Sequence, residues 1–310
     1  MLGRLPAPLI GGIMMLLLCI NTLVFAIPVY LLIIVKLLTR RGGGARDAVS
    51  RGISAFAQQW AVNNVWLSDS FLPIRWDIRV DANVDPRGQY LVCANHQSWN
   101  DILVLIKTFG GRAPFFKFFL KRELIWVPVL GLAWWGLDYP FMKRHTKEQI
   151  ARNPALKGQD IETTRKACEA FRNQPALVLN FLEGTRFTPV KREAQRSPYR
   201  HLLRPKSGGF AFALDALGAK LNALLDVTIV YPQGSRGFWD FLAGRVRHVV
   251  VEVRQLTVPP ALYDGSYEDD AEFRARFHGW IAALWNEKDA RIDAVLSGEP
   301  RVAARAVADY

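Results

Sequence analysis

The feature that most constrains this chain is a long apolar stretch near its N-terminus. Residues 5–35 contain no Asp, Glu, Lys or Arg. About 20 apolar residues suffice for a helix to cross a bilayer, and a buried core helix is rarely this long. The stretch also exceeds the apolar part of a secretory signal, and no small-residue cleavage site follows it. We therefore predict a membrane anchor over residues 1–40. Because Asn21 and Pro28 interrupt it, both a kinked span and a helical hairpin in one leaflet fit.

Positive charge lies mainly on the C-terminal side of this anchor. Arg4 precedes it, and five basic residues follow it: Lys36, Arg40, Arg41, Arg46 and Arg51. Cytoplasmic flanks of membrane segments carry such an excess of Lys and Arg. We therefore expect the rest of the protein to face the cytoplasm.

Overall charge and cysteine usage narrow the function classes only partly. The chain has 40 Lys and Arg against 28 Asp and Glu, a formal net charge of +12. This balance suits nucleic acid, an anionic membrane or a phosphate-bearing substrate. Cys19, Cys93 and Cys168 form neither a CxxC pair nor a zinc-type cluster. The pattern indicates a reducing compartment and predicts neither a disulfide framework nor a metal site.

The remaining pattern alternates strands and helices, which predicts an α/β fold with a mixed, largely parallel sheet flanked by helices. A glycine-rich linker and a helix over residues 47–64 would occupy residues 41–70, and a catalytic domain would occupy residues 71–310. Strands are expected at residues 71–84, 90–93, 176–181, 227–231 and 246–253, with a turn at residues 85–88. Helices are expected at residues 101–109, 160–172 and 209–217, and from residue 269 onward.

A second apolar segment, residues 124–137, is too short to span a bilayer. It contains Trp126, Trp134 and Trp135. Tryptophans are enriched at membrane interfaces, and an ordinary hydrophobic core would explain them equally well. The basic residues just before the segment favour membrane contact slightly: Lys117, Lys121 and Arg122.

His96 and Asp101 are the candidate catalytic residues, in the sequence Asn-His-Gln-Ser-Trp-Asn-Asp that follows a predicted strand. Such strand ends are where α/β sheets place their sites. The histidine pKa lies near cytoplasmic pH, so His96 suits proton abstraction from a hydroxyl. A carboxylate on its other ring nitrogen would fix the tautomer. By itself this spacing more often marks a capped turn. Metal binding is disfavoured because no third ligand lies nearby.

Two further stretches carry candidate phosphate ligands. Glu183, Gly184, Thr185 and Arg186 follow another apolar strand. Glycine permits a sharp turn, and the planar guanidinium of Arg186 matches phosphate oxygens. Glu183 could hold Arg186 or bind an acceptor hydroxyl. The other stretch has two adjacent cations, Lys143 and Arg144, which could hold an anionic head group. Taken singly, a loop salt bridge and a solvated basic turn explain these stretches as well.

In combination, these blocks resemble the glycerolipid acyltransferases, which include 1-acylglycerol-3-phosphate acyltransferase. His96 and Asp101 match the family's HxxxxD block, with Asn95 and Ser98 also in place. Phe141 and Arg144 match its FxxR block, residues 183–186 match its EGTR block, and Pro232 matches its single-proline block. The match covers residues 90–232, and the bacterial inner-membrane members look most similar.

The resemblance implies that His96 is the general base and Asp101 its orienting partner. Lys143, Arg144 and the 183–186 block would bind the phosphate of a lysophospholipid acceptor. Acyl-CoA or acyl carrier protein would be the donor, with no cofactor. The enzyme would lie in the bacterial inner membrane, in contact with membrane lipids. Leu182 replaces a frequent proline and Lys143 a frequent acidic residue, which indicates a branch acting on varied lysophospholipids.

Two other functions remain open from the residues. One is a basic, membrane-tethered nucleic-acid-binding protein, although the sequence has no nucleic-acid motif and we expect no nucleic-acid partner. The other is a thioester hydrolase, which would use the same base on water.

Overall fold

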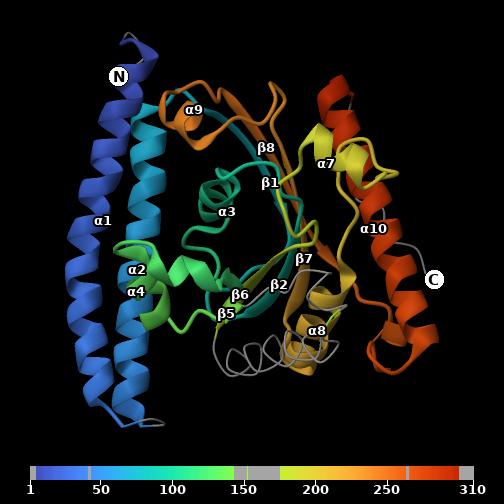
Figure 1. Cartoon of the computed structure of the whole chain (residues 1–310), viewed down its shortest axis with the longest axis horizontal. Coiled ribbons are helices and arrows are strands. Elements are labelled where there is room, and N and C mark those ends of the chain that lie inside the picture. Colours follow the sequence, from blue (N-terminus) through green and yellow to red (C-terminus); the bar gives the residue numbers. More distant parts are fainter. Residues whose placement is uncertain (1–4, 41–42, 143–151, 153–174, 263–264, 300–310) are drawn as a thin grey trace.

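The computed structural model describes residues 5–40, 43–142, 152, 175–262 and 265–299. Its centre is a six-stranded sheet (Figure 1). In spatial order the strands are β1 (Arg75–Asp81), β8 (His248–Leu256), β7 (Ala223–Val230), β2 (Gln89–Ala94), β6 (Ala176–Phe181) and β3 (Phe116–Phe118). All neighbours are parallel except β7 and β8. The predicted mixed, largely parallel α/β sheet is therefore confirmed.

Helices cover both faces of this sheet, so its central strands are fully buried. Every residue of β2 and β7 is buried, and most of these residues are apolar, as expected for strands covered on both faces. One face packs against α8 (Ser207–Leu217) and α10 (Ala271–Ser297). The other packs against α3 (Asp101–Phe109) and α9 (Phe238–Leu242). Short elements complete this part: α7 (Pro189–Ala194), η3 (Gly218–Lys220) and η4 (Pro260–Leu262).

The face under α10 contains a buried ion cluster. Lys288 of α10 is fully buried, and its Nζ lies 2.5 Å from Oδ1 of Asp226 in β7. Arg254 of β8 donates to the other oxygen of Asp226 over 2.9 Å. Two cations thus balance one buried carboxylate, while Glu287 pairs with Arg254 at 2.6 Å. The cluster fixes α10 to the middle of the sheet.

The N-terminal apolar stretch is one continuous helix, α1 (Ala7–Leu38). A short connection joins it to a second helix, α2 (Gly44–Phe71), which runs antiparallel to α1 (Figure 1). Pro28 lies inside α1 without ending it. Asn21 faces α2, where its amide donates 2.7 Å to Asn64 and 3.1 Å to the Trp60 carbonyl. Among the described residues, α1 is the one helix long and apolar enough to cross a membrane.

A small second sheet continues beyond the main one. β4 (Leu120–Lys121) follows β3 and pairs with β5 (Phe141–Met142). Between them come η2 (Arg122–Trp126) and α4 (Leu130–Gly136), which pack beside α1. Because β3 runs parallel to β6, this excursion leaves from the edge where the parallel strands end.

Several predicted boundaries are wrong, among them that of the strand expected over residues 227–231, which spans Ala223–Val230. The helix expected over residues 47–64 extends to Phe71, and the strand expected from residue 71 begins at Arg75. Leu72 caps α2 because the following Pro73 disfavours helical backbone in the residue before it. The predicted turn, the strands at residues 90–93 and 176–181, and the helix at residues 101–109 are confirmed. The helix expected at residues 160–172 lies outside the described residues.

Candidate active site

The candidate residues gather at the carboxyl ends of three adjacent parallel strands. His96 follows β2, Glu183 follows β6 and Tyr231 follows β7. Since β2 lies between β6 and β7, the loops after these strands meet at one edge. This edge is the usual position of a site in an α/β sheet.

His96 and Asp101 form a hydrogen-bonded pair at this edge. Nδ1 of His96 lies 2.8 Å from Oδ2 of Asp101, which sits in the first turn of α3. Asp101 is fully buried, whereas the His96 side chain is 17% exposed. The imidazole also stacks on Phe181, with ring centres 4.0 Å apart. The ring is therefore oriented on one side and open to a ligand on the other.

Asp101 is held in place by three further donors. Its Oδ2 accepts the backbone N–H groups of Gln97 (2.7 Å) and Ser98 (3.0 Å). Its Oδ1 accepts the hydroxyl of Tyr231 over 2.7 Å. Burial, followed by the charge of Asp101, raises the pKa of Tyr231, so that hydroxyl remains a donor. Four hydrogen bonds compensate the desolvation of this carboxylate and fix its orientation.

The Glu183 carboxylate binds backbone N–H groups and does not contact Arg186. It is fully buried, and its two oxygens accept the N–H groups of His96 (2.8 Å) and Leu203 (2.9 Å). Burial and these two bonds occupy the carboxylate, so the expected contact of Glu183 with Arg186 is not made in this structure. Glu183 instead positions the loop that carries His96.

The ionisation of Glu183 predicts how the stability of the protein changes with pH, and replacing Glu183 tests that prediction. Burial raises its pKa to about 7, although the bonds from His96 and Leu203 oppose the shift. A raised pKa means that the folded state holds the proton more tightly. The resulting stability is complete at acidic pH and is lost as pH rises through about 7. Relative to Glu183→Gln, the wild-type free energy of unfolding should fall by about 3 kcal/mol between pH 4.5 and 7.

Thermal unfolding of both proteins in one detergent, across this pH range, would measure that difference. The glutamine has one acceptor oxygen for two backbone donors, so the variant should be less stable at every pH. If the melting temperatures of the two proteins changed with pH in the same way, the raised pKa of Glu183 would be contradicted.

Gly184, Thr185 and Arg186 form a turn beside His96. Gly184 has φ +65°, a conformation that favours glycine, and an added Cβ would lie 3.0 Å from the Lys206 side chain. Thr185 accepts a hydrogen bond from Lys191 over 2.8 Å. The guanidinium carbon of Arg186 lies 4.1 Å from the ring centre of Trp99, which is 62% exposed. Arg186 is thus held at the open side of the site by a cation–π contact.

Most basic side chains between Arg186 and Lys206 form hydrogen bonds or ion pairs within the protein. Lys191 donates to the Arg186 carbonyl, and Arg192 donates to the Tyr199 carbonyl over 2.7 Å. Arg204 donates to the Arg196 carbonyl, and Arg200 pairs with an acid on α10. Except for Arg200, these side chains bond to uncharged carbonyl groups and keep their charge, so the surface near Arg186 stays positive.

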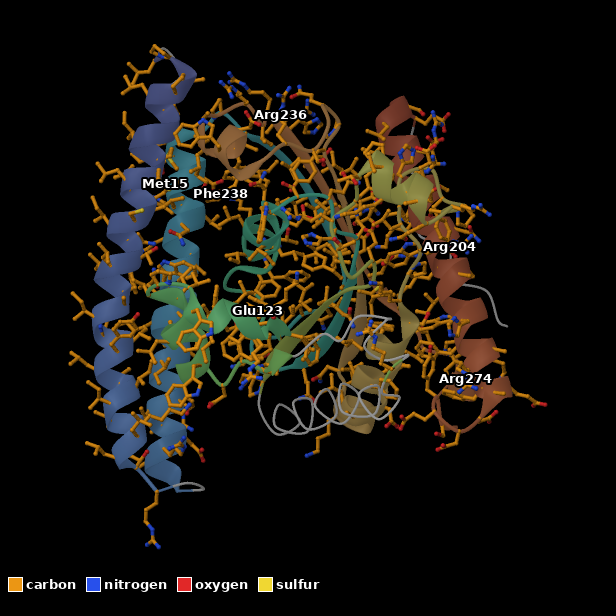
Figure 2. All side chains as sticks on the ribbon, in the orientation of Figure 1. Met15, Glu123, Arg204, Arg236, Phe238 and Arg274 are labelled. Atoms are coloured by element: carbon orange, nitrogen blue, oxygen red, sulfur yellow. The ribbon has the colours of Figure 1, made fainter. Side chains whose placement is uncertain are left out.

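The loop after β7 closes this edge and contacts α1. The Arg236 carbonyl accepts the hydroxyl of Ser98 (2.7 Å) and the side-chain amide of Asn100 (3.1 Å). In α9, the Trp239 ring would lie 3.0 Å from a Cβ on Gly11 of α1. Figure 2 labels Arg236 and, nearby, Phe238 and Met15, both of which pack on the core cluster that also includes residues of α3. The first helix therefore reaches the loop that holds the His96 turn.

Lys143 and Arg144, the other expected phosphate ligands, lie outside the described residues. Their neighbour Phe141 is in β5, whose partner β4 follows β3 beyond the carboxyl edge. Among the described residues, no group of three or more His, Cys, Asp or Glu could hold a metal ion.

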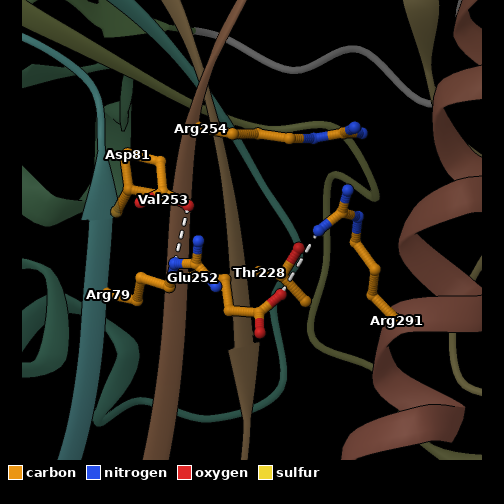
Figure 3. A pocket seen from close by; sticks show the side chains of 7 residues that line it. All are labelled: Arg79, Asp81, Thr228, Glu252, Val253, Arg254 and Arg291. Carbon is orange, nitrogen blue, oxygen red and sulfur yellow. Dashed lines mark hydrogen bonds and ion pairs between the residues drawn. The ribbon is translucent and has the colours of Figure 1, made fainter. Parts of the chain in front are cut away.

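A small cavity elsewhere does not belong to this site. It lies between the sheet and α10 and contains none of the candidate residues (Figure 3). Four of its charged side chains pair with one another, with Arg79 2.7 Å from Asp81 and Arg291 3.5 Å from Glu252. The His96 edge remains the candidate site.

Sequence reasoning overlooked three contributors: Tyr231, Phe181 and Trp99. Tyr231 lies between an apolar strand and Pro232, and this position in the sequence could have marked it as a site residue. Asn95 matched a motif, and the structure shows its role: its amide pairs with both backbone groups of Ile229, at 2.8 and 2.9 Å. That pair joins the ends of β2 and β7.

Comparison with known proteins places residues 75–232 in a match to the Acyltransferase family model. An uncharacterized acyltransferase of Saccharomyces cerevisiae is 27% identical over 246 residues, or 67% of this chain and 59% of that protein. Human 1-acyl-sn-glycerol-3-phosphate acyltransferase delta is 28% identical over 185 residues, covering 56% and 44% respectively. The chain thus spans about half the length of these curated relatives.

A crystal structure of the 1-acyl-sn-glycerophosphate (LPA) acyltransferase PlsC from Thermotoga maritima was also found. It is 17% identical, with a TM-score of 0.46, and the alignment covers 88% of this chain and 98% of that one.

Proposed function

This chain belongs to the Acyltransferase family, and on that basis we propose that it moves a fatty acyl group from a thioester to a hydroxyl of a lysophospholipid. The single observation that carries the proposal is the His96–Asp101 pair, 2.8 Å apart and held by three other donors. Acyl-CoA or acyl carrier protein would be the donor. A lysophospholipid such as 1-acyl-sn-glycerol 3-phosphate would be the acceptor.

The proposed reaction begins at the ring nitrogen of His96 that does not face Asp101. With Nδ1 bound to Asp101, Nε2 takes the proton from the acceptor hydroxyl as its oxygen attacks the thioester carbonyl. Asp101 stabilises the imidazolium that forms. Collapse of the tetrahedral intermediate breaks the carbon–sulfur bond and releases the thiolate, which recovers the proton from His96. An ester and a free thiol result.

Direct attack by the acceptor fits the surroundings of His96 better than an acyl-enzyme does. Ser98 is the hydroxyl residue nearest to His96 in sequence. It is only 4% exposed, and its Oγ donates to the Arg236 carbonyl. The Thr185 hydroxyl is engaged by Lys191. Both hydroxyls therefore hold the loops in place, and neither is available as a nucleophile.

We further propose that Arg186 binds the acceptor's phosphate, with Lys143 and Arg144 contributing to the same head group. The stacking of Arg186 on Trp99 leaves the edge of its guanidinium available for phosphate oxygens. Gly184 and Thr185 would shape the turn that presents it. Glu183 would act through the backbone of His96 rather than on the substrate.

Removing this guanidinium should mainly weaken acceptor binding. Arg186→Ala should raise KM for a phosphate-bearing acceptor by about 10- to 100-fold, the worth of one or two charge-assisted hydrogen bonds. Arg186→Lys should fall between alanine and wild type, because an ammonium keeps the charge and loses the fork. Arg200→Ala is the control, since that exposed arginine pairs with Asp293 instead. An unchanged KM in Arg186→Ala would remove Arg186 from the acceptor site.

For location we propose the cytoplasmic face of a bacterial inner membrane. Most large side chains of α1 that are exposed are apolar, including Leu16, Leu23, Ile27 and Leu31, each at least 57% exposed. The same helix contacts α9 near its start and α4 near its end. A polar catalytic domain cannot follow it through hydrocarbon. The contacts therefore favour a helical hairpin lying along one leaflet over a span that projects from the domain.

An assay of product identity tests the proposed function. Purified protein would receive a panel of lysophospholipids, with radiolabelled acyl-CoA or acyl carrier protein as donor. Diacyl phospholipid is the expected product. Release of free fatty acid at the same rate without acceptor would instead support the thioester hydrolase. Family membership favours acyl transfer over the nucleic-acid-binding alternative.

A further inference from the structure

The segment from η2 through α4 exposes large apolar side chains on the protein surface. Trp126 is 85% exposed, the highest fraction of any exposed large apolar residue described. In α4, Leu132 and Trp135 are 47% and 42% exposed, and their spacing of three places them on one helix face. Neighbouring Lys121 and Arg122 are also exposed. One exposed acid, Glu123, follows them, so the segment combines an apolar face with an edge of net positive charge.

The same segment is fastened to the last turns of α1. Lys36 is buried, and its Nζ donates 2.8 Å to the Gly136 carbonyl and 2.6 Å to Oδ2 of Asp138. The Tyr30 hydroxyl donates 2.6 Å to the Val129 carbonyl. These bonds join α1 to both ends of α4.

Close packing and backbone strain accompany these bonds. A Cβ on Gly136 would lie 2.4 Å from the Ile33 side chain, so α4 approaches α1 as nearly as glycine permits. Val129 and Asp138, which flank α4, have φ of +65° and +58°. Such conformations are costly for residues other than glycine and persist where the surroundings enforce them. The orientation of α4 relative to α1 is thus strongly determined.

We propose that residues 122–137 form a second membrane-contacting surface, with a lipid bilayer as the partner. Exposed tryptophan suits the interface between head groups and acyl chains, and exposed lysine and arginine suit anionic head groups. The surface adjoins the part of α1 where Leu31, Ile34 and Val35 are 44–60% exposed. Seven residues of α4 cannot span a bilayer, so the segment lies on the membrane. Lys36 fixes its depth relative to α1.

This inference rests on the proposed membrane attachment of α1, and not on the acyl-transfer chemistry. The test uses three full-length proteins with one cysteine each, labelled with an environment-sensitive nitrobenzoxadiazole dye. The first keeps native Cys19, which is exposed on α1. The second carries Trp126→Cys and the third Val190→Cys, with native cysteines replaced by alanine. Val190, in α7, is 77% exposed and provides the matched control.

The labelled proteins would be bound to vesicles of phosphatidylcholine with phosphatidylglycerol. Position 126 should shift its emission to shorter wavelength and be quenched by brominated lipids, as position 19 is, while position 190 shows neither. If position 126 behaves like position 190 while position 19 responds, the second surface is disproved and membrane attachment stands. If position 19 also fails to respond, both ideas fall.

The role of Lys36 has a separate readout. Lys36→Met keeps the aliphatic stem and removes the ammonium that holds Gly136 and Asp138. In this background quenching at position 126 should fall, while quenching at position 19 stays the same. Equal quenching at position 126 with and without Lys36 would show that the pair does not set the depth of the segment.

Discussion

Replacing His96 with alanine should lower kcat for acyl transfer by about 10²–10⁴-fold, the usual contribution of a positioned general base. The loss should appear in kcat rather than in KM, because His96 would act on the hydroxyl proton in the transition state. The fold should persist, since the imidazole is partly exposed and its deletion leaves the backbone bond to Glu183 in place. Steady-state kinetics with purified protein would measure the effect, and membrane lipid mass spectrometry would show it in cells.

The matched control is another histidine on the same chain. His278 of α10 is exposed and bonds to the Tyr267 hydroxyl over 2.8 Å, away from the strand ends. His278→Ala should leave kcat within about twofold of wild type, because surface substitutions rarely perturb stability much. Near-normal transfer by His96→Ala in this comparison would refute the proposed mechanism.

Replacing Asp101 with asparagine should lower kcat on the order of 10³-fold, with a smaller effect on stability. The amide oxygen can still accept from Gln97, Ser98 and His96, and the Tyr231 hydroxyl can rotate to accept from the new amide N–H. Geometry is therefore largely kept, while the negative charge that stabilises the imidazolium is lost. Kinetics combined with thermal unfolding would separate the two effects, and a loss of about 1–2 kcal/mol is expected.

A second carboxylate–histidine pair supplies the control. Asp293 accepts from Nε2 of His201 over 2.9 Å on the outer part of the protein. Asp293→Asn should leave kcat unchanged and alter stability slightly, since this acid is partly exposed. If Asp101→Asn and Asp293→Asn reduced activity equally, the special role of Asp101 would be excluded.

Local patterns predicted the elements that carry the site. The boundaries of α3 and β6 match the expected residues because each begins or ends at a clear change between apolar and polar sequence. The expected His96–Asp101 contact is present since both residues belong to one strand–turn–helix unit. Such information lies within a few residues of sequence and does not depend on the rest of the fold.

The contributions that sequence did not predict come from pairings distant in the chain. Tyr231 reaches Asp101 across 130 residues, and Glu183 reaches His96 across 87. Both contacts depend on β6 and β7 lying on either side of β2, an order that no local pattern encodes. The same reason explains why Glu183 looked like a substrate ligand: its charge suggested a surface role, while its burial is a property of the assembled sheet.

The docking of α1 has a consequence for how such a protein can change over evolution. One side of α1 belongs to the protein interior, through Met14, Ile33 and Lys36, and the other side meets its surroundings. A helix docked in this way is not an interchangeable module. A generic hydrophobic helix grafted in its place would keep the hydrophobicity of α1 but lose its shape complementarity to the domain. The flank of α2 that packs against α1 would then become exposed. Inheritance should therefore keep the first helix and the catalytic domain together, as parts of one folding unit.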